Sequence, residues 1–357
     1  MRRVPQIAAL VVVVLTMTIP TPARAQHGDW LLGTLGLLSA QQPPEGILYQ
    51  NLWSYYHASN NGFLTTGLVK CGPLSKLCLD ANFNTKGSVD LFVDQNIFWL
   101  VPPFKIPFIG ATYGALVDVP FAIADASAGG SIQPALVFNG FRSSGTLLGP
   151  TLETAGGSTK GSIADIYFEP INLGWYFKQL DAMVTGGFFA PTGPYNSGAK
   201  LNIGDGHWTG VLGLGGILYA DRERTWALSV MAHYLIYASQ MGRPYTLGDD
   251  VPFEWGASKT FNLSTEDVSQ ITFGAVGYAQ WQATDNQISV APNGPFESST
   301  IRRLEETKKQ IYAAGPAVQV LTKFGLFALR YYDEFGARAT PSGQQLMFSV
   351  TLAGKPW

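Results

Sequence analysis

The sequence predicts an all-β protein, a closed antiparallel transmembrane β-barrel of about twelve strands with long external loops. Three observations carry this prediction: an export signal at the N-terminus, the lack of any later apolar run long enough for a membrane helix, and alternation of apolar and polar residues at period two. Strands that face hydrocarbon must close into a ring, because lipid offers no hydrogen bonds to a free sheet edge.

The first 25 residues have the three parts of a secretory signal peptide. Arg2 and Arg3 precede an apolar run at 7–19, and Ala23-Arg24-Ala25 forms a small-x-small cleavage site. An uncleaved anchor is the alternative reading, but the run is shorter than the ~20 residues that span a bilayer as a helix. We therefore expect residues 1–25 to be removed on export, and the protein to reside in the outer membrane of a Gram-negative cell.

The composition fits a barrel better than a soluble domain. Charged residues make up 13% of the chain, against about 25% in ordinary soluble domains. Aromatic residues also reach 13%, and there are 40 glycines. The net charge of −2 excludes nucleic acid as a partner, because phosphate binding requires a concentrated basic surface. The partners expected instead are outer-membrane lipid, the barrel-assembly machinery and a small hydrophobic or aromatic solute.

Alternating segments identify the strands. Residues 88–96, 162–169 and 345–352 alternate most clearly. Nine further segments complete the predicted set: 47–58, 108–119, 183–190, 210–219, 226–238, 251–261, 270–282, 310–321 and 325–335. With both termini in the periplasm, short turns then alternate with longer external loops, as in single-chain bacterial barrels.

Segments outside these strands have separate expectations. Residues 26–44 are predicted to form a periplasmic or interfacial segment ahead of a barrel that occupies residues 45–357. The apolar piece 132–138 contains Pro134, which removes a ladder hydrogen bond, so it is assigned to the external loop 120–161. That loop folds either as a plug or as a surface hairpin. Pro170 and Pro316 are expected at bulges or strand ends.

The same alternation predicts which polar side chains face the lumen. The candidates are Asp90, Asp94, Asp165, Glu169, Arg330 and Glu334. They would form either a water-filled, cation-leaning passage or a set of salt bridges that braces a narrow barrel. A twelve-stranded barrel lies between filled eight-stranded barrels and open sixteen-stranded porins, so both readings stand.

The two cysteines, Cys71 and Cys78, lie in a segment rich in Gly, Pro and Asn that is predicted to be external. Export places them in an oxidising compartment, which favours a disulfide. A metal pair or free thiols are the alternatives, but no nearby His or further Cys completes a tetrahedral site. No metal and no cofactor are therefore predicted.

Catalysis is not predicted. The four histidines are His27, His57, His207 and His233, and the pair considered is His233 with Ser229 on the same side of its strand. Residues four apart on a strand lie ~13 Å apart, which forbids a direct hydrogen bond. The sequence also lacks a nucleophile elbow, a zinc motif, a phosphate loop and a dinucleotide fingerprint.

One motif carries a family resemblance. Pro191-Thr192-Gly193-Pro194-Tyr195, followed by Asn202, Gly204, Gly206, His207 and Trp208, resembles the meta-pathway phenol degradation protein family. The similarity extends upstream to Asp165, Pro170 and Trp175, and downstream to Gly277-Tyr278, Gln280 and the stretch 330–343. It covers roughly residues 45–353.

The resemblance implies an outer-membrane barrel that moves hydrophobic or aromatic compounds. Within the motif, Pro191 and Gly193 are expected to make a turn, Asn202 to cap backbone groups, and Tyr195 and Trp208 to join the aromatic girdle. The motif either shapes its loop or contacts cargo. A structural or lipid-modifying barrel without transport activity is the alternative function.

Overall fold

The computed structural model describes residues 30–61, 70–71, 77–139, 144–148, 152–199, 201–263, 268–289 and 308–353. Twelve antiparallel strands form a closed barrel, which confirms the predicted fold class. In chain order the barrel strands are β1 (Gly46–Asn61), β3 (Leu77–Val101), β4 (Thr112–Asn139), β7 (Ile166–Tyr176), β8 (Leu180–Ala190), β9 (Thr209–Tyr219), β10 (Trp226–Tyr237), β12 (Asp250–Asn262), β13 (Val268–Gln282), β15 (Gln310–Thr322), β16 (Gly325–Arg338) and β17 (Gly343–Ala353).

The first and last strands close the ring. β1 pairs with β17 from Leu48, opposite Ala353, to Ala58, opposite Gly343, and its other edge pairs with β3. Each predicted strand segment overlaps one of the twelve barrel strands. In the described part of the chain, no helix is long and apolar enough to cross a membrane.

The two ends of the barrel differ in their connections. At one end the strands are joined by short segments such as 177–179, 220–225 and 323–324. At the other end most connections are longer, for example 191–208, and we call this end external, following the expected topology. The pairing of β7 with β8 shifts register between Phe168 and Ile171, so Pro170 lies at a bulge, as predicted.

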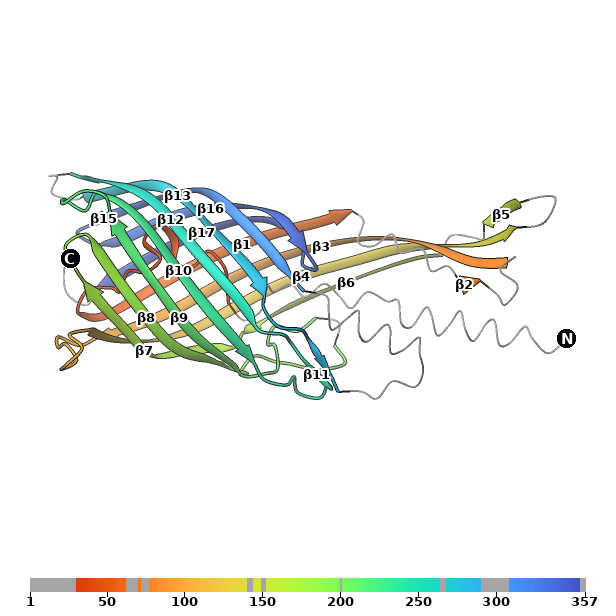
Figure 1. Ribbon diagram of the computed structural model, residues 1–357, viewed down its shortest axis with the longest axis horizontal. Helices are drawn as coiled ribbons and strands as arrows, with labels where there is room; N and C mark the ends of the chain where they lie inside the picture. Colours follow the sequence, from red (N-terminus) through yellow and green to blue (C-terminus); the bar gives the residue numbers. More distant parts are fainter. Residues whose placement is uncertain are drawn as a thin grey trace.

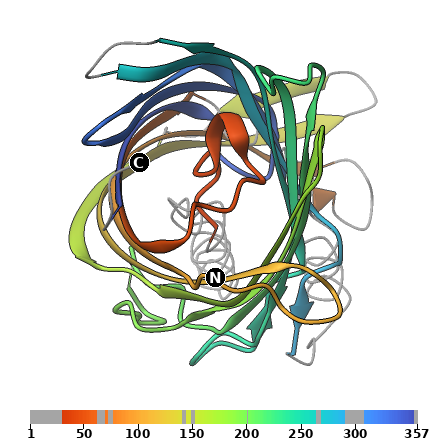
Figure 2. The ribbon, with the colours of Figure 1, turned by 90° about the vertical axis from the view of Figure 1, so that its left-hand side faces the viewer.

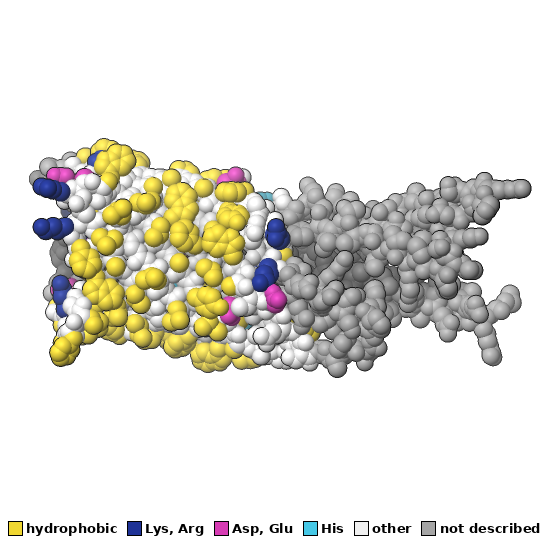
Figure 3. Space-filling view, viewed as in Figure 1, with side chains coloured by type: hydrophobic (Ala, Val, Ile, Leu, Met, Phe, Trp, Pro, Cys, Tyr) yellow, Lys and Arg dark blue, Asp and Glu magenta, His cyan; other side chains and the backbone are white. Residues whose placement is uncertain are grey.

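The outer wall of the barrel is apolar. Exposed large side chains lie on most strands, among them Phe98, Leu214, Leu228 and Phe273, each about half exposed or more. Figure 3 shows hydrophobic side chains spread over one face of the barrel wall, with Lys and Arg side chains toward its two ends. This distribution is typical of a wall that faces lipid.

Three strands continue beyond the barrel at the external end. Figure 1 shows β3, β4 and β6 (Leu152–Ile163) projecting outward, with β2 (Lys70–Cys71) and β5 (Ser144–Leu148) at the far tip. Residues 132–138 belong to this extension, because the pairing of β4 with β3 continues through Phe138. Of the two arrangements expected for loop 120–161, the described backbone therefore adopts the outward hairpin and not the plug.

The two cysteines lie opposite one another in this projection. Cys71 of β2 is the antiparallel partner of Cys78 of β3. Directly opposite residues have Cα atoms about 4.5–5.5 Å apart, which falls within the range that a disulfide bridges. We therefore expect intact-mass analysis of the exported protein to show Cys71 linked to Cys78. Two alkylatable thiols in unreduced protein would contradict this prediction.

The barrel lumen is filled by the N-terminal segment that precedes β1. Figure 2 shows this segment inside the ring of strands. Trp30, Leu32 and Leu37 are at most 8% exposed and belong to a cluster that includes lumenal side chains of the wall. The expectation of a periplasmic or interfacial segment is therefore wrong for residues 30–42, which we call the plug. Its only regular structure is a 3-10 turn, η1 (Gly36–Leu38).

Candidate functional site

A single buried carboxylate on the wall holds the start of the plug. Glu254 of β12 is 2% exposed. One of its oxygens accepts a hydrogen bond from the Trp30 indole N–H at 3.0 Å, and the other accepts from the Leu35 backbone N–H at 3.0 Å. A carboxylate can accept both bonds because it offers two oxygens, and bonds to a charged acceptor are stronger than neutral ones.

Other wall residues fix the backbone of the plug. The Arg330 guanidinium donates to the Thr34 carbonyl at 2.9 Å, and the Tyr332 hydroxyl donates to the Gly33 carbonyl at 2.9 Å. Gly33 has a φ of +86°, and a Cβ there would lie 2.7 Å from the Tyr332 ring, so this position requires glycine.

The rest of the plug is held by β10, next to the strand that carries Glu254, and by β7. Gln42 donates to the Asn172 side chain at 2.9 Å, and the Ser229 hydroxyl donates to the Leu37 carbonyl at 2.8 Å. Ser229 is thus engaged with the plug. Its strand neighbour on the same side, His233, packs against Trp30 with ring centroids 4.0 Å apart. Both residues of the pair considered for catalysis therefore contact the plug.

An aromatic cluster surrounds Trp30. Tyr167 of β7 and Phe189 of β8 lie edge-on to the indole, with centroid distances of 5.8 and 6.4 Å. Tyr167 and Phe189 also contact each other, at 4.6 Å. Edge-on and tilted contacts bring the positive edge of one ring to the negative face of another. The lumen beside Trp30 therefore has an aromatic surface supplied by both plug and wall.

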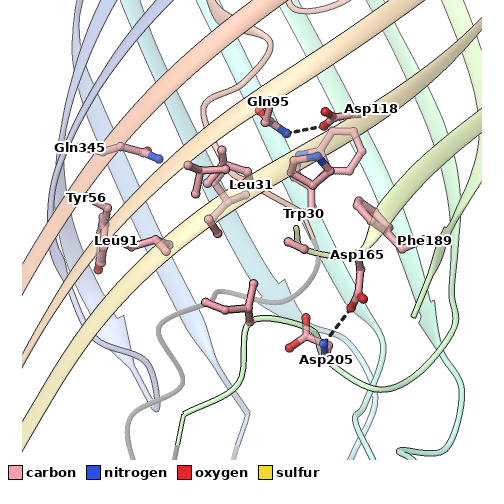
Figure 4. A pocket seen from close by; sticks show the side chains of 16 residues that line it. Trp30, Leu31, Tyr56, Leu91, Gln95, Asp118, Asp165, Phe189, Asp205 and Gln345 are labelled. Carbon is pink, nitrogen blue, oxygen red and sulfur yellow. Dashed lines mark hydrogen bonds between the residues drawn. The ribbon is translucent and has the colours of Figure 1, made fainter. Parts of the chain in front are cut away.

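Two cavities lie along the plug on the side of β3, β4, β7 and β8. The one nearer the external end, seen in Figure 4, has a volume of about 60 Å³. Its lining includes Leu91, Val93 and Gln95 of β3, Asp118 of β4, Asp165, Phe189, and Ile203 and Asp205 of the loop 191–208.

The second cavity is larger, about 150 Å³, and continues toward the short-turn end. It is lined by Ile97 and Trp99 of β3, Leu116 of β4, Tyr167 and Glu169 of β7, Met183 and Thr185 of β8, and Met231 and His233 of β10. Both cavities touch Trp30, Leu31, Gln95, Asp118 and Phe189. The two cavities are therefore neighbours that share these lining residues, and their linings follow β3, β4, β7 and β8 from one to the other.

Four of the predicted lumenal residues lie inside the barrel. Asp165, Glu169, Arg330 and Glu334 are at most 8% exposed. Glu334 accepts hydrogen bonds from Tyr56 and Tyr278, and Glu169 accepts from Tyr167 and Asn172. Asp165 and Glu169 line a cavity, whereas Arg330 and Glu334 do not. These partners are neutral side chains, so the salt bridges of the bracing arrangement stay a prediction.

Asp90 and Asp94 lie on the outer side of the barrel, so the expectation that they face the lumen is wrong. Asp90 accepts hydrogen bonds from the exposed Tyr55 and from His57, and its side chain is 41% exposed. The alternating side chains Val89, Leu91 and Val93 point inward instead, where they pack with apolar residues of loop 191–208 and with Leu31. Because apolar side chains occupy the lumen beside β3, the apolar face of this strand points inward and its polar face outward, opposite to the prediction.

The loop that carries the family motif is folded against the external cavity by Asp165. Its carboxylate accepts the backbone N–H groups of Gly193 and Asp205, each at 2.7 Å. Gly193 and Gly204 touch backbone to backbone, because a Cβ on Gly204 would lie 2.5 Å from the Gly193 carbonyl oxygen. The two glycines therefore allow the two halves of the loop to cross closely.

The other motif residues also act within the loop. Asn202 exchanges hydrogen bonds of 3.0 Å with the backbone of Asn196 in both directions. Tyr195 packs over Gly206, and His207 bonds Thr209. Trp208 is 52% exposed and contacts Phe188 on the outer wall. Pro191 follows β8 directly and lines neither cavity. The motif thus shapes the loop, which in turn presents Ile203 and Asp205 to the cavity.

Substituting Asp165→Ala tests this role. The change leaves the N–H groups of Gly193 and Asp205 without their acceptor, at about 1–3 kcal/mol for each buried group. We expect protease cleavage within 191–208 to accelerate by about tenfold or more, because local opening becomes easier. Asp285→Ala removes an exposed carboxylate and is the control. Equal cleavage rates in both variants would contradict the assignment.

The sequence pattern did not identify the residues that matter most for the cavities. Trp30 lies ahead of the first strand, and Gln95, Asp118 and Phe189 have no charge pattern or motif of their own. The signal available was the leucine-rich composition of 29–39, with Trp30 at its start, which is unusual for a segment exposed to water. Among the described residues, no group of three or more His, Cys, Asp or Glu is placed to hold a metal ion.

Comparison with known sequences decides the family. Residues 80–350 match the family described as "Putative MetA-pathway of phenol degradation". The chain belongs to this family. The match includes the loop motif and nearly all barrel strands. No match was found among curated protein sequences.

A solved outer-membrane channel shares the fold of this family member. The COG4313 outer membrane channel from Pseudomonas putida F1 superposes with a TM-score of 0.52 at 10% identity, over 88% of this chain and 97% of that one. The CymD monoaromatic hydrocarbon channel aligns with a TM-score of 0.34 at 10% identity, over 87% and 89% of the two chains. A Pseudomonas aeruginosa FadL homologue gives 0.31 at 9%, over 87% and 90%. Only the first likeness is close enough to support an argument, and it shows the barrel fold.

Proposed function

We propose that this family member is an outer-membrane channel through which small hydrophobic, mainly aromatic, compounds pass. One observation carries the proposal: the larger cavity beside the plug has a volume of about 150 Å³, and aromatic and aliphatic side chains make up about half of its lining, beside polar ones. A cavity of about 150 Å³ is large enough to hold benzene. The expected solute is therefore a single aromatic ring with small substituents.

The arrangement of the cavities supports passage rather than storage. Successive inward-facing residues of β3 line first the external cavity, at Leu91, and then the larger one, at Trp99. Gln95, between them, lines both cavities. A solute that entered from the external end would move between the plug and one side of the wall, without displacing the hydrogen bonds that Glu254 and Arg330 make to the plug.

The plug also gives a reason for selectivity. It occupies the lumen, so the barrel lacks the wide aqueous pore of larger porins. The remaining space is small, and about half of the lining of its larger cavity is aromatic or aliphatic. A polar solute would lose part of its hydration there at a cost in free energy, whereas an aromatic hydrocarbon has no such cost. Sugars and ions should therefore be excluded.

Early uptake of radiolabelled toluene by Gram-negative cells, with and without the protein, tests the proposal. Whole cells are required because the lipopolysaccharide leaflet, unlike a simple phospholipid bilayer, slows the entry of apolar solutes. We expect faster toluene uptake with the protein and unchanged uptake of a labelled sugar.

A blocking variant and its matched control complete this experiment. Leu116→Trp adds bulk inside the larger cavity and should return toluene uptake to the level of cells without the protein. Leu214→Trp makes the same change at an outward position that is 66% exposed, and should leave uptake unchanged. Toluene uptake that does not depend on the protein, at equal amounts of folded barrel, would refute the proposed function.

A further inference from the structure

Two buried polar side chains line both cavities. They are Gln95, which is 8% exposed, and Asp118, which is 5% exposed. The Gln95 amide nitrogen donates a hydrogen bond of 2.6 Å to one oxygen of Asp118, which Figure 4 shows directly beside the Trp30 ring. This bond fixes the direction of the Gln95 amide, because its N–H side faces the carboxylate.

The remaining oxygen of each group has no partner. Within the part of the chain that the structure describes, Gln95 Oε1 and Asp118 Oδ1 are buried and accept no hydrogen bond. Gln345, across the external cavity, repeats the pattern: its nitrogen donates to Ser54 at 2.9 Å, while its oxygen has no partner. Each of these three side chains has one polar atom hydrogen-bonded within the protein and one oxygen that can accept a further hydrogen bond.

The ring system next to these acceptors offers them no donor. The Trp30 indole N–H is bonded to Glu254, and the Tyr167 hydroxyl is bonded to Glu169. A buried polar group without a partner costs about 1–3 kcal/mol, so a ligand that supplies an N–H or O–H there gains affinity over one that does not. The aromatic surface beside Trp30 thus adjoins two acceptors, on Gln95 and Asp118, while Thr185 and His233, which are able to donate, also line the larger cavity.

We infer that Gln95 and Asp118 select, among the aromatic solutes of this channel, those that carry a hydrogen-bond donor such as a ring hydroxyl or amine. The inference rests on the proposed function and narrows its substrate class. The ring lies against Trp30 and Phe189 while its O–H or N–H donates to Gln95 Oε1 or Asp118 Oδ1. A hydrocarbon of the same size enters the same space but leaves the acceptors without a partner.

The test compares phenol with toluene, which replaces the hydroxyl by a methyl group of similar size. Dissociation constants are measured by ligand-observed NMR on the purified barrel in detergent. Each variant is then judged by the ratio of its phenol and toluene constants, relative to wild type, so that partition into the detergent cancels. Gln95→Met keeps the volume and removes the acceptor. We expect it to lower the preference for phenol by about tenfold.

Two further variants define the effect. Asp118→Asn can still accept the Gln95 bond but turns an N–H toward the cavity, so it should also reduce the preference for phenol. Ser258→Ala removes a buried oxygen that likewise has no partner but lines neither cavity, and should leave the ratio unchanged. Anisole, which has the oxygen but no proton, should bind wild type as weakly as toluene.

The outcomes separate this inference from the proposed function. Equal ratios in wild type and in Gln95→Met, with toluene still bound, would overturn the inference and leave the channel intact. If neither solute binds the wild-type barrel, the proposed function fails and the inference with it. If Gln95→Met does not fold, two other measurements replace it. An unchanged phenol-to-toluene ratio in Asp118→Asn, together with equal binding of phenol and anisole to the wild type, would overturn the inference.

Discussion

Replacing plug residues 30–42 by a Gly/Ser sequence of equal length is expected to convert the barrel into an open, ion-conducting pore. The plug contributes Trp30, Leu32 and Leu37 to the core inside the ring of strands. A Gly/Ser sequence has no side chains to pack there and makes none of the bonds to Glu254 or Arg330, so it would behave as a flexible chain. Water and ions would then fill the lumen.

Single-channel recording in planar bilayers measures this change. The wild-type protein should show little or no ionic conductance, and the replaced protein should show a large, steady conductance. The barrel strands are untouched by the replacement, and heat-modifiable migration in detergent gels checks that the ring is still closed. Equal conductance in the two proteins, both folded, would mean that the plug does not occlude the lumen.

Glu254→Ala is expected to weaken the attachment of the plug. The substitution leaves the Trp30 indole N–H and the Leu35 N–H without an acceptor. A buried donor that loses its partner costs about 1–3 kcal/mol, and two donors lose theirs here. We expect a lower midpoint of urea unfolding in lipid vesicles and more frequent current openings in the bilayer recordings.

The control for this variant is Glu223→Ala, which removes an exposed glutamate in the short turn between β9 and β10. It should shift the unfolding midpoint little, because exposed substitutions away from such networks usually change stability by less than about 0.5 kcal/mol. An unfolding midpoint that is the same for the Glu254 and Glu223 variants would show that the carboxylate does not hold the plug.

The barrel strands were predictable because alternation is a local property. A strand between lipid and lumen must place successive side chains on opposite faces, so the pattern at 345–352 marks β17 without knowledge of any partner strand. Pro316 was predicted at a bulge or a strand end, and this prediction is wrong. The residue lies within β15, and the pairing with β13 continues in register on both sides of it.

The direction of each face was harder to predict, because it depends on what fills the lumen. In β16 the lumenal side carries Arg330 and Glu334, as the pattern indicated. In β3 the lumenal side carries Val89 and Leu91, because apolar residues of the plug and of loop 191–208 pack there. Alternation alone gives the two faces but not which of them is inside.

The candidate site was least predictable, because its residues meet only through the closed barrel. Trp30 and Glu254 are separated by 224 positions, and Gln95 and Asp118 belong to two different strands. No local pattern reports such contacts. The family motif did point to the correct end of the barrel, but its residues build the loop above the cavity and leave most of the lining to other segments.

A crystal structure of the protein soaked with bromobenzene tests the central claim most directly, because bromine can be located by its anomalous scattering. The account predicts a bromine peak inside the barrel, in the cavity bounded by Trp30, Tyr167 and Met183. Bromine found only on the outer wall, with that cavity unchanged, would contradict a passage for aromatic solutes beside the plug.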